Sequence, residues 1–463
     1  MEYISTRGKV SGVGFIDAIL MGLADDGGLL VPARIPQVSA DTLKQWQELS
    51  YQELALEIFT LYIGEEIPRE ELRQLVDDSY STFRDADVTP VRKLHEGLDV
   101  MELFHGPTFA FKDVALQFLG NLYSYVARKT GSTIHIVGAT SGDTGASAIE
   151  GVRGKEGIRI CILHPHGKVS KVQELQMTTV DDANVLNLAI DGTFDDGQRI
   201  IKELFADVDF KHRYHLRAIN SINIARILAQ TVYYFYAYLQ LARRGQAAAV
   251  SFSVPTGNFG DIFAGYLAKR MGLPVNRLIL ATNENNILAH FVSEGVYQPG
   301  EFRGTYSPSM DIQVASNFER YLFYLYGEDA SSVTELMEQF KQNGTITIPQ
   351  EKLAVVQSDF SAHAVLNQEC LDTIAHYHKE TGYLLDPHTA CGVAAADRLA
   401  SESGATVALS TAHPAKFDES IRLVGIEQPY PSQISGLFEQ SQHVELSPAS
   451  NEAIAARLVK FFE

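Results

Sequence analysis

Apolar residues return every three or four positions over much of the N-terminal part of the chain. Segments 42–63 and 69–83 show this spacing, which is the spacing of an amphipathic helix. Ser39 and Asp41 precede the first helix and Pro68 stands at the start of the next, and these residue types favour a helix start. The N-terminal part is therefore predicted to be mostly helical.

From about residue 97 the pattern changes to short β-rich runs that alternate with helical stretches. Strands that alternate with helices predict parallel sheets covered on both faces, which is the α/β class. Ligands bind such sheets beyond the carboxyl ends of the strands, so we expect the chemistry in the loops there. The predicted strands lie within 98–104, 133–139, 158–165, 247–255, 277–283 and 406–411, and the predicted helices within 112–129, 142–153, 260–272 and 388–400.

The composition is that of a globular, acidic protein. The chain has 463 residues, which predicts two or three domains. Lys and Arg total 38 and Asp and Glu total 57, which gives a net charge of −19. This charge argues against nucleic acid or an anionic membrane as a partner, because both require a basic face. The three cysteines contain no C-x-x-C pair, so we expect no disulfide framework and a reducing compartment.

No segment is predicted to cross a membrane or to direct secretion. The first 20 residues carry scattered charges and have no continuous apolar centre. The longest uncharged, aromatic-rich run, between Arg226 and Arg243, has 16 residues, whereas a span needs about 20 mostly apolar ones. We expect a buried helix there and a cytoplasmic protein. No metal site is expected, because two histidine pairs lack zinc-ligand spacing: His164 with His166, and His376 with His378.

The loop SVPTGNFGD joins a β-rich run to a helix. The β-rich run ends at Pro255, Gly257 and Gly260 free the backbone, and a helix opens at Asp261. Backbone N–H groups at a glycine turn before a helix form a cradle for an anion. The alternative is a tight turn that binds no ligand.

The loop HIVGATSGDTGAS has the same strand–loop–helix outline. Thr140, Ser141, Asp143 and Thr144 are crowded between three glycines, and this set suits a carboxylate or a phosphate. Asp143 would repel an anion unless the partner of its carboxylate is a donor. The spacing matches neither G-x-G-x-x-G nor the P-loop, and G-x-S-x-G is absent. A helix start rich in capping residues is the alternative.

Lys112 is an isolated cation in the run FHGPTFAFKD, among Phe109, Ala110, Phe111 and Val114. Apolar surroundings destabilise an ammonium group, so a lysine there becomes a usable amine nucleophile. The alternative is a lysine that extends to solvent from a helix start.

A fourth segment, RAINSINIARILAQ, supplies a second cation. Asn220 and Ser221 are cap-type residues, and Arg226 lies one turn into the following helix. A guanidinium beside a helix N-terminus is a good clamp for phosphate, although a helix cap with a surface arginine is the alternative. Together the four loops describe a site with an amine nucleophile and two or three separate anion pockets.

These segments, with others in the same order, resemble the threonine synthase family of the bacterial and fungal type, which are pyridoxal-phosphate (PLP) enzymes of fold type II. The resemblance implies two α/β domains with parallel-rich sheets flanked by helices, plus an N-terminal accessory region. The implied bounds are 1–95 for the accessory region, 96–115 with 245–463 for a large PLP-binding domain, and 116–244 for a smaller mobile domain. The motifs are MEYISTRG, LADDGGLLVP, FHGPTFAFKD, GATSGDTGAS, HPHGKVSKVQELQMTT, NSINIARILAQ, PTGNFGD, DIQVASNFERYLF, LLDPHTACG and STAHPAKF.

The resemblance also assigns cofactor residues. Lys112 would hold PLP as a Schiff base and shuttle protons. Thr411 would place a hydroxyl against the pyridine nitrogen, and Asp143 would lie near the cofactor's 3′ oxygen, a contact that the family pattern leaves open. The loop that would cradle the phosphate consists of Gly257, Asn258, Phe259, Gly260 and Asp261.

The substrate residues follow from the same resemblance. The loop with Thr140, Ser141 and Thr144 would receive the substrate carboxylate. For Arg320 in the SNFER motif, the resemblance leaves open a contact with substrate or a structural role. The residues that would clamp the substrate phosphate are Asn220, Ser221 and Arg226.

The implied reaction converts O-phospho-L-homoserine and water to L-threonine and phosphate, by γ-elimination and β-addition of water, as the last step of threonine biosynthesis. The implied protein is a monomer or homodimer. Two alternatives stay open. One is a PLP-dependent phospho-lyase acting on O-phosphothreonine or O-phosphoserine, and the other is a binding protein without catalytic activity.

The negative charge of the chain and its anionic ligands lead to a first prediction. If local cations dominate binding, neutralising distant surface carboxylates changes substrate affinity little, whereas Arg226→Ala costs on the order of 2–4 kcal/mol. Substrate titration of both kinds of variant measures this. Comparable effects from the two would contradict the prediction.

Overall fold

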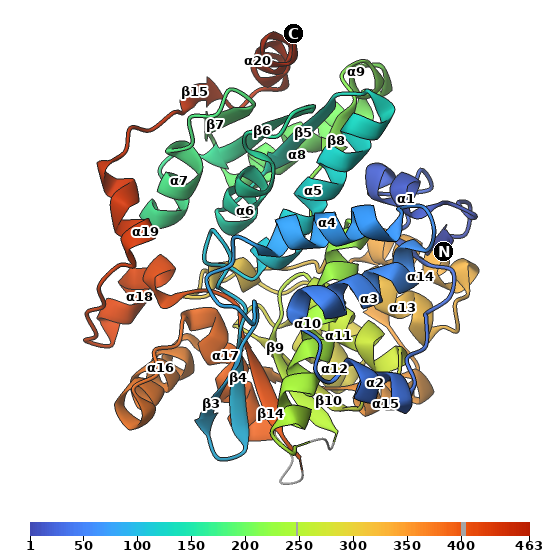
Figure 1. Cartoon of the computed structure of the whole chain (residues 1–463), viewed down its shortest axis with the longest axis vertical. Coiled ribbons are helices and arrows are strands. Elements are labelled where there is room, and N and C mark those ends of the chain that lie inside the picture. The colour runs from blue at the N-terminus through green and yellow to red at the C-terminus, as the bar shows by residue number, and fades with distance from the viewer. Residues whose placement is uncertain (247–248, 400–403) are drawn as a thin grey trace. The chain divides into compact units, whose positions relative to one another are not determined.

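The computed structural model describes residues 1–246, 249–399 and 404–463 (Figure 1). Residues 247, 248 and 400, at the ends of two predicted elements, lie outside the described residues. The chain divides into two compact units. The first unit comprises Met1–Val76, Phe83–His105 and Ser221–Glu427, and the second comprises Asp77–Thr82, Gly106–Asn220 and Gln428–Glu463.

A six-stranded sheet lies at the centre of the first unit. In order across the sheet its strands are β13 (Phe360–Ala364), β10 (Val275–Thr282), β9 (Val250–Pro255), β14 (Thr406–Ser410), β4 (Leu98–Glu102) and β3 (Val91–His95). All neighbours are parallel except β3 and β4. Every residue of β9 and β14 is buried, as in parallel strands covered on both faces. The predicted parallel α/β sheet is confirmed.

Three helices pack around the middle of this sheet: α10 (Ile224–Arg243), α11 (Gly260–Arg270) and α17 (Pro387–Leu399). Helix α17 packs against β9, β10 and β14, and α11 packs against β9, β10 and α10. Helix α10 is buried from Ile224 to Leu241, which confirms the prediction that the uncharged run is a buried helix. This helix carries Arg226, so its burial sets the environment of that cation.

The remaining elements of this unit are short or lie at its periphery. The helices are α1 (Phe15–Met21), α2 (Ala40–Trp46), α3 (Tyr51–Ile63), α12 (Ile287–Glu294), α13 (Phe318–Leu325), α14 (Ala330–Asn343), α15 (Gln350–Asp359), α16 (Asn367–Thr381) and α18 (Asp418–Leu423), with the 3-10 helices η1 (Pro308–Met310) and η2 (Pro414–Phe417). The small strands pair as β1 (Tyr3–Ser5) with β2 (Leu30–Pro32), and β11 (Val296–Tyr297) with β12 (Ile346–Thr347). The boundary between the units falls within α4 (Arg69–Tyr80).

The predicted N-terminal helices are present, with two differences in detail. Ser39 caps α2, because its side chain accepts a hydrogen bond from the Thr42 N–H at 3.1 Å. Asp41 lies inside the first turn of α2, so its placement before the helix was wrong. The segment 42–63 forms two helices rather than one, because Ser50 starts α3 with a capping box that includes Glu53.

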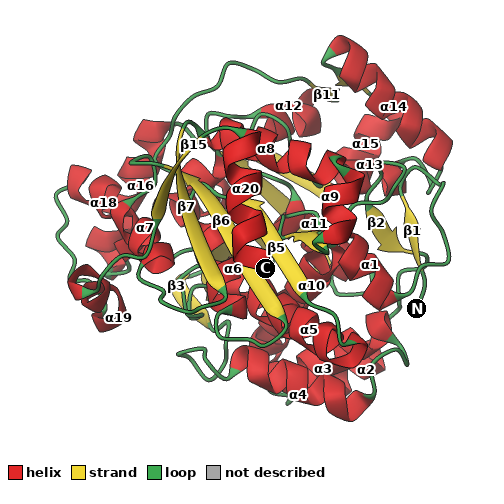
Figure 2. Cartoon of the chain, turned by 90° about the horizontal axis from the view of Figure 1, so that it is seen from above, coloured by secondary structure: helices red, strands yellow, loops and turns green. Residues whose placement is uncertain are grey.

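A five-stranded, fully parallel sheet forms the second unit (Figure 2). Across the sheet its strands are β15 (Glu445–Pro448), β7 (Val185–Asp191), β6 (Ile158–Pro165), β5 (Ile134–Ala139) and β8 (Leu216–Ala218). The helices are α5 (Lys112–Thr130), α6 (Asp143–Val152), α7 (Lys171–Thr178), α8 (Phe194–Ala206), α9 (Val208–Arg213), α19 (Ser432–Ser435) and α20 (Asn451–Phe462), with the 3-10 helix η3 (Gly436–Glu439).

The C-terminal segment completes this second sheet. Strand β15 pairs in parallel with β7, and Figure 2 shows α20 in front of the strands. Ile454, Leu458 and Phe462 of α20 join a buried cluster that includes Leu188 of β7. Residues 428–463 thus belong to the smaller sheet by contact, and 221–244 to the first unit. The division into domains with distinct functions, drawn from the resemblance, stays a prediction.

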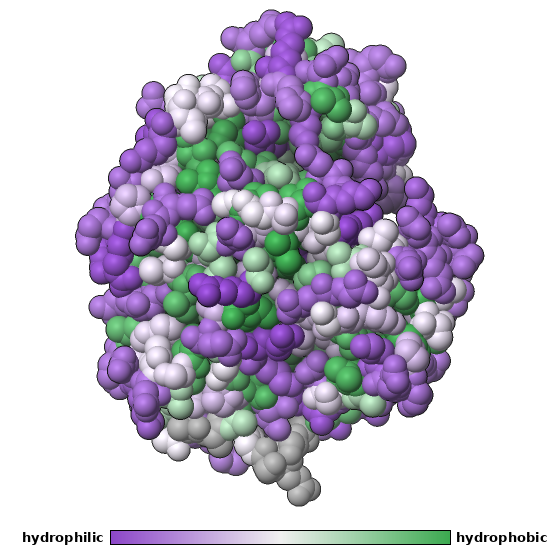
Figure 3. Space-filling view, turned by 90° about the vertical axis from the view of Figure 1, so that its right-hand side faces the viewer, coloured by the Kyte–Doolittle hydropathy of each residue, from purple (hydrophilic) through white to green (hydrophobic). Residues whose placement is uncertain are grey.

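The described helices show no membrane-spanning candidate: none is both long enough and apolar enough to cross a bilayer. The face seen in Figure 3 carries hydrophilic residues over most of its area, with apolar residues between them in smaller groups. The aromatic run of α10 is buried in the first unit. The aromatic run is therefore part of the hydrophobic core of this unit.

The contact between α20 and the second sheet gives a stability prediction. Leu458→Ala leaves a cavity under α20 and should lower the free energy of unfolding by about 2–4 kcal/mol. Leu446→Ala on β15 is the matched control, because Leu446 is 71% exposed, and it should change stability by less than about 0.5 kcal/mol. Urea denaturation of the two variants measures the difference. Equal losses would show that α20 does not stabilise the unit.

Candidate functional site

Lys112 is the first residue of α5 in the second unit and is only 8% exposed. Its Nζ lies 3.6 Å from Oδ2 of Asp143 and 5.6 Å from the centre of the Phe111 ring. The buried amine therefore lies close to a carboxylate and to an aromatic ring. Lys112 is not a lysine that extends from a helix start into solvent.

The turn before Lys112 is held by residues of its own motif. The Asp113 carboxylate accepts hydrogen bonds from the N–H and the hydroxyl of Thr108, both at 2.7 Å. A Cβ on Gly106 would lie 2.4 Å from Cβ of Asp113, so only glycine fits there. The Thr108 hydroxyl is also 2.8 Å from the Ser147 hydroxyl, which joins this turn to α6. Sequence reasoning missed these roles, although Gly106 and Asp113 flank Lys112 in the quoted motif.

Asp143 opens helix α6, and its carboxylate contacts the donors Lys112 and Gln173. Besides Lys112, its Oδ1 accepts a hydrogen bond from Nε2 of Gln173 at 2.7 Å. Both partners are donors, which meets the condition set for a carboxylate in an anion-binding loop. Gly142 has φ 145°, and a Cβ there would lie 2.4 Å from Oε1 of Gln173, so this glycine allows the close approach. Gln173 was not foreseen, because it lies 30 residues away on α7.

The hydroxyls of the 140–144 loop have different environments. The buried Thr140 hydroxyl accepts hydrogen bonds from the N–H groups of Gly142 and Gly145, at 3.0 and 2.9 Å. It therefore orders the start of α6. Ser141 is exposed and Thr144 is half-buried, so these two hydroxyls are the more accessible ones.

The 257–261 loop follows β9 in the first unit. The backbone N–H groups of Gly257, Asn258 and Phe259 make no hydrogen bond to any described residue. Phe259 has φ 67°, and its ring packs among Phe318, Tyr321 and Phe360, which anchors the turn. A Cβ on Gly257 would lie 2.9 Å from the Ser309 carbonyl oxygen, so glycine is required there. The loop has the free N–H groups of an anion cradle.

Asp261 belongs to this loop, but its carboxylate has a structural environment. Oδ1 accepts hydrogen bonds from the hydroxyls of Tyr233 and Tyr234 at 2.5 and 2.8 Å. Burial raises the pKa of Asp261 to about 6. These tyrosines belong to the aromatic run of α10, which was expected to be a core helix and is one. The side chain of Asp261 thus fastens α11 to α10 through Oδ1, whereas its buried Oδ2 has no hydrogen-bond partner among the described residues.

Arg226 lies on α10 and is 4% exposed. Its Nη1 is buried and has no hydrogen-bond partner among the described residues. Burial lowers the pKa of this guanidinium to about 10. A buried guanidinium nitrogen without an acceptor is costly, and an anionic ligand would remove that cost. Arg226 is therefore not the surface arginine of the alternative interpretation.

The other predicted clamp residues are divided between the units. Ser221 begins the main segment of the first unit, and its hydroxyl is 2.8 Å from that of Ser316. Asn220 ends a segment of the second unit, and its buried Oδ1 lacks a partner among the described residues. Asn223 caps α10, because its Oδ1 accepts a hydrogen bond from the Ala225 N–H at 3.1 Å.

Thr411 and Arg320 are the remaining residues of the first unit for which the sequence suggested a functional role. Thr411 is buried directly after β14, and its N–H donates to the Thr389 hydroxyl at 3.2 Å. Arg320 is fully buried and donates hydrogen bonds to the carbonyls of Leu30 and Ile222. The structure shows that the Arg320 side chain braces the fold.

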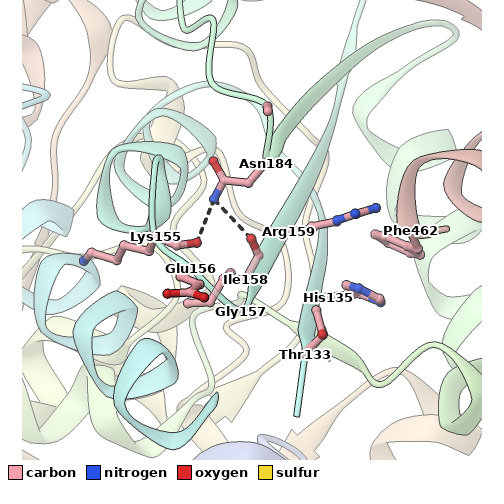
Figure 4. Close-up of a pocket in the computed structure, with 10 residues that line it drawn as sticks. Thr133, His135, Lys155, Glu156, Gly157, Ile158, Arg159, Asn184 and Phe462 are labelled. Atoms are coloured by element: carbon pink, nitrogen blue, oxygen red, sulfur yellow. Dashed lines mark hydrogen bonds between the residues drawn. The ribbon is translucent and has the colours of Figure 1, made fainter. Parts of the chain in front are cut away.

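A pocket of about 410 Å³ in the second unit lies away from the 140–144 loop (Figure 4). It is formed at the amino ends of β5 and β6, whereas the 140–144 loop follows the carboxyl end of β5. Two of its polar side chains bond to the backbone: Asn184 donates to the carbonyls of Lys155 and Ile158, and His135 contacts the Tyr214 carbonyl. None of the predicted site residues lines this pocket.

Comparison with known proteins agrees with this arrangement. The family model described as "Threonine synthase N terminus" matches residues 2–80, "Pyridoxal-phosphate dependent enzyme" matches 87–339, and "Threonine synthase, C-terminal" matches 389–458. Threonine synthase of Schizosaccharomyces pombe is 44% identical over 99% of this chain and 98% of its own. That of Pseudomonas aeruginosa is 46% identical over 97% and 96%. The crystal structure of PLP-bound threonine synthase from Brucella melitensis has a TM-score of 0.97 and 45% identity, over 100% of both chains.

The residues present fit PLP. The cofactor requires an amine for its aldehyde and donors for its phosphate. Lys112 supplies a buried amine, and the 257–259 turn supplies N–H groups without acceptors among the described residues. No group of three or more His, Cys, Asp or Glu in the described part of the chain is arranged to hold a metal ion.

The raised pKa of Asp261 predicts a pH dependence of stability. Its carboxyl binds a proton more tightly in the folded chain than in the unfolded chain, where the pKa is near 3.9. Its contribution to stability is therefore fully present below about pH 4 and is lost as the pH rises through about 6. Between pH 7 and pH 4 the apoprotein should gain about 2–3 kcal/mol of unfolding free energy relative to Asp261→Asn. Urea titrations of both proteins across this range measure it, and parallel pH profiles would refute it.

Proposed function

The chain belongs to the threonine synthase family of PLP-dependent enzymes, and we propose how its residues divide the work of that reaction. The enzyme is a carbon–oxygen lyase that forms L-threonine with PLP as its cofactor. The observation that carries the assignment of residues is the buried amine of Lys112 beside Asp143 at the start of α5.

Three elements hold the cofactor in this proposal. Lys112 would bind its aldehyde carbon, the turn at 257–259 would bind its phosphate through backbone N–H groups, and the Thr411 hydroxyl would face its ring nitrogen. A hydroxyl at that position would leave the nitrogen largely unprotonated, unlike a carboxylate partner. Asp143 would lie near the 3′ oxygen. When bound, PLP draws electrons from the substrate carbons, so that their protons can be removed.

Lys112 is the base that moves protons. Its Nζ must be neutral to accept the α-proton of the substrate and charged to return a proton. Its Nζ lies 3.6 Å from the Asp143 carboxylate, which would face the amine when it carries the proton. Gln173 keeps the Asp143 carboxylate oriented through its 2.7 Å hydrogen bond.

The substrate, O-phospho-L-homoserine, carries two anionic groups. Arg226 binds its phosphate, with Ser221 and Asn220 as further contacts, and the 140–144 loop receives its carboxylate. Arg226 stabilises the departing phosphate because a guanidinium forms charge-assisted hydrogen bonds with phosphate oxygens. The C–O bond at the γ-carbon breaks, and water then supplies the hydroxyl group at the β-carbon. Phosphate and L-threonine are the products.

The setting of the enzyme is also part of the proposal. The acidic composition and the absence of a membrane-spanning helix among the described residues fit a cytoplasmic enzyme that acts as a monomer or homodimer. Nucleic acid is not expected as a partner, because the net charge of −19 opposes it.

The proposal predicts that Lys112→Ala lowers kcat for O-phospho-L-homoserine by at least about 1,000-fold, because it removes the amine that binds the cofactor and moves protons. Lys129→Ala is the matched control, since Lys129 is an exposed lysine in the last turn of the same helix. An assay that follows threonine and phosphate together measures both variants.

Full turnover by Lys112→Ala would overturn the assignment of this lysine. Release of ammonia from O-phosphothreonine by the wild-type enzyme, without threonine formation from O-phospho-L-homoserine, would identify a phospho-lyase instead.

A further inference from the structure

The motif LLDPHTACG has no assigned role, and its aspartate has an unusual number of partners. Asp386 is fully buried and directly precedes α17. Its Oδ1 accepts hydrogen bonds from the N–H and Nδ1 of His388, at 2.9 and 2.8 Å. Its Oδ2 accepts hydrogen bonds from the N–H and the hydroxyl of Thr389. A helix cap accounts for the backbone bonds, but not for the two side-chain bonds.

The side-chain bond between Thr389 and Asp386 connects this carboxylate to Thr411. The Thr389 hydroxyl has one proton and two possible acceptors, the Asp386 carboxylate and, at 3.2 Å, the Ser410 hydroxyl. The shorter bond, to the charged Asp386, takes this proton, and Ser410 can then donate to Thr389. The Thr389 oxygen is then available as an acceptor, and the Thr411 N–H donates to it at 3.2 Å. Thr389 is fully buried, so water does not compete for these bonds. Asp386 therefore sets the direction in which Thr389 presents its lone pairs to the Thr411 backbone.

The side-chain bond between His388 and Asp386 connects this carboxylate to the 257–261 loop. Nδ1 of His388 donates to Asp386, which leaves Nε2 as an acceptor, and the Ser309 N–H donates to Nε2 at 3.2 Å. The Ser309 carbonyl oxygen lies 2.9 Å from the position of a Cβ on Gly257. The segment at Ser309 is therefore a wall of the phosphate loop, and Asp386 fixes this wall through the tautomer of His388.

We propose that Asp386 is a positioning residue for the cofactor, because one buried carboxylate aligns Thr411 through Thr389 and the wall of the phosphate loop through His388. All of these residues belong to the first unit. The inference rests on the proposed function in one respect, namely that Thr411 and the 257–261 loop bind PLP. The inference adds Asp386 as the residue that fixes the positions of Thr411 and of the 257–261 loop.

Separate variants test the two branches. Thr389→Val removes the acceptor of the Thr411 N–H and preserves the shape of the side chain, whereas Thr389→Ser retains the hydroxyl. His388→Phe removes the acceptor of the Ser309 N–H. Asp386→Asn preserves the helix cap but presents an amide donor to one of the two side chains. The readouts are the dissociation constants of PLP and of pyridoxal, which lacks the phosphate, for the apoenzyme, and the absorbance spectrum of bound PLP.

The two branches should differ in these readouts. Thr389→Val should weaken PLP and pyridoxal by a similar factor, roughly fivefold to tenfold, and shift the absorbance band, with recovery in Thr389→Ser. His388→Phe should weaken PLP by roughly tenfold but pyridoxal little, because it loosens only the phosphate side. Asp386→Asn should combine both effects.

The control is Tyr377→Phe, which removes a hydrogen bond of 2.8 Å between the Tyr377 hydroxyl and Asp397 at the other end of α17. It should leave both dissociation constants and the spectrum unchanged. If the Thr389 and His388 variants bind PLP and pyridoxal as the wild type does, Asp386 is only a helix cap and the inference fails, while the proposed function stands. If wild-type protein forms no Lys112-linked cofactor, the proposed function fails instead.

Discussion

The parallel arrangement of the strands decides where this protein can carry chemistry. In a parallel sheet all carboxyl ends lie at one edge, and each strand there releases a loop that leads into a helix. In the second unit β5 leads into the 140–144 loop. In the first unit β9 leads into the 257–261 loop, and β14 ends next to Thr411. Free N–H groups and helix starts accumulate at such edges, which suits anionic ligands even though the protein as a whole is acidic.

Buried charges then distinguish structural groups from functional ones. Arg320 and Arg226 are both buried in the first unit, and burial lowers the pKa of each, to about 9 and about 10. The guanidinium of Arg320 is engaged by carbonyls and by Asn317. Arg226 has a buried nitrogen with no partner among the described residues. The same residue type is thus fully engaged in one place and, among the described residues, left with an unpaired nitrogen in the other, and the difference lies in the acceptors that surround it.

Two carboxylates also differ in their partners. Asp261 is held by two tyrosine hydroxyls and fastens two helices, whereas Asp143 contacts Lys112 and a glutamine. Both lie at the start of a helix that follows a glycine-rich turn, and both were expected to serve the cofactor. Residue type and loop position did not separate them. The partners that do so, Tyr233 and Gln173, lie 28 and 30 residues away in the chain.

Much of the fold and the place of the site could be read from the chain itself. Alternation of strands with helices, glycines in tight turns and a lysine among apolar residues are local patterns, and they arise from sterics and hydrophobic burial within a few residues. The partners of Asp143, the network around Asp386 and the pairing of β15 with β7 join segments far apart in sequence. A single sequence carries no periodic signal for such contacts, because they depend on which surfaces meet after folding. The sequence by itself therefore determined the class of fold and the loops in which the chemistry is expected, and only the tertiary structure decided which buried groups hold one another in place.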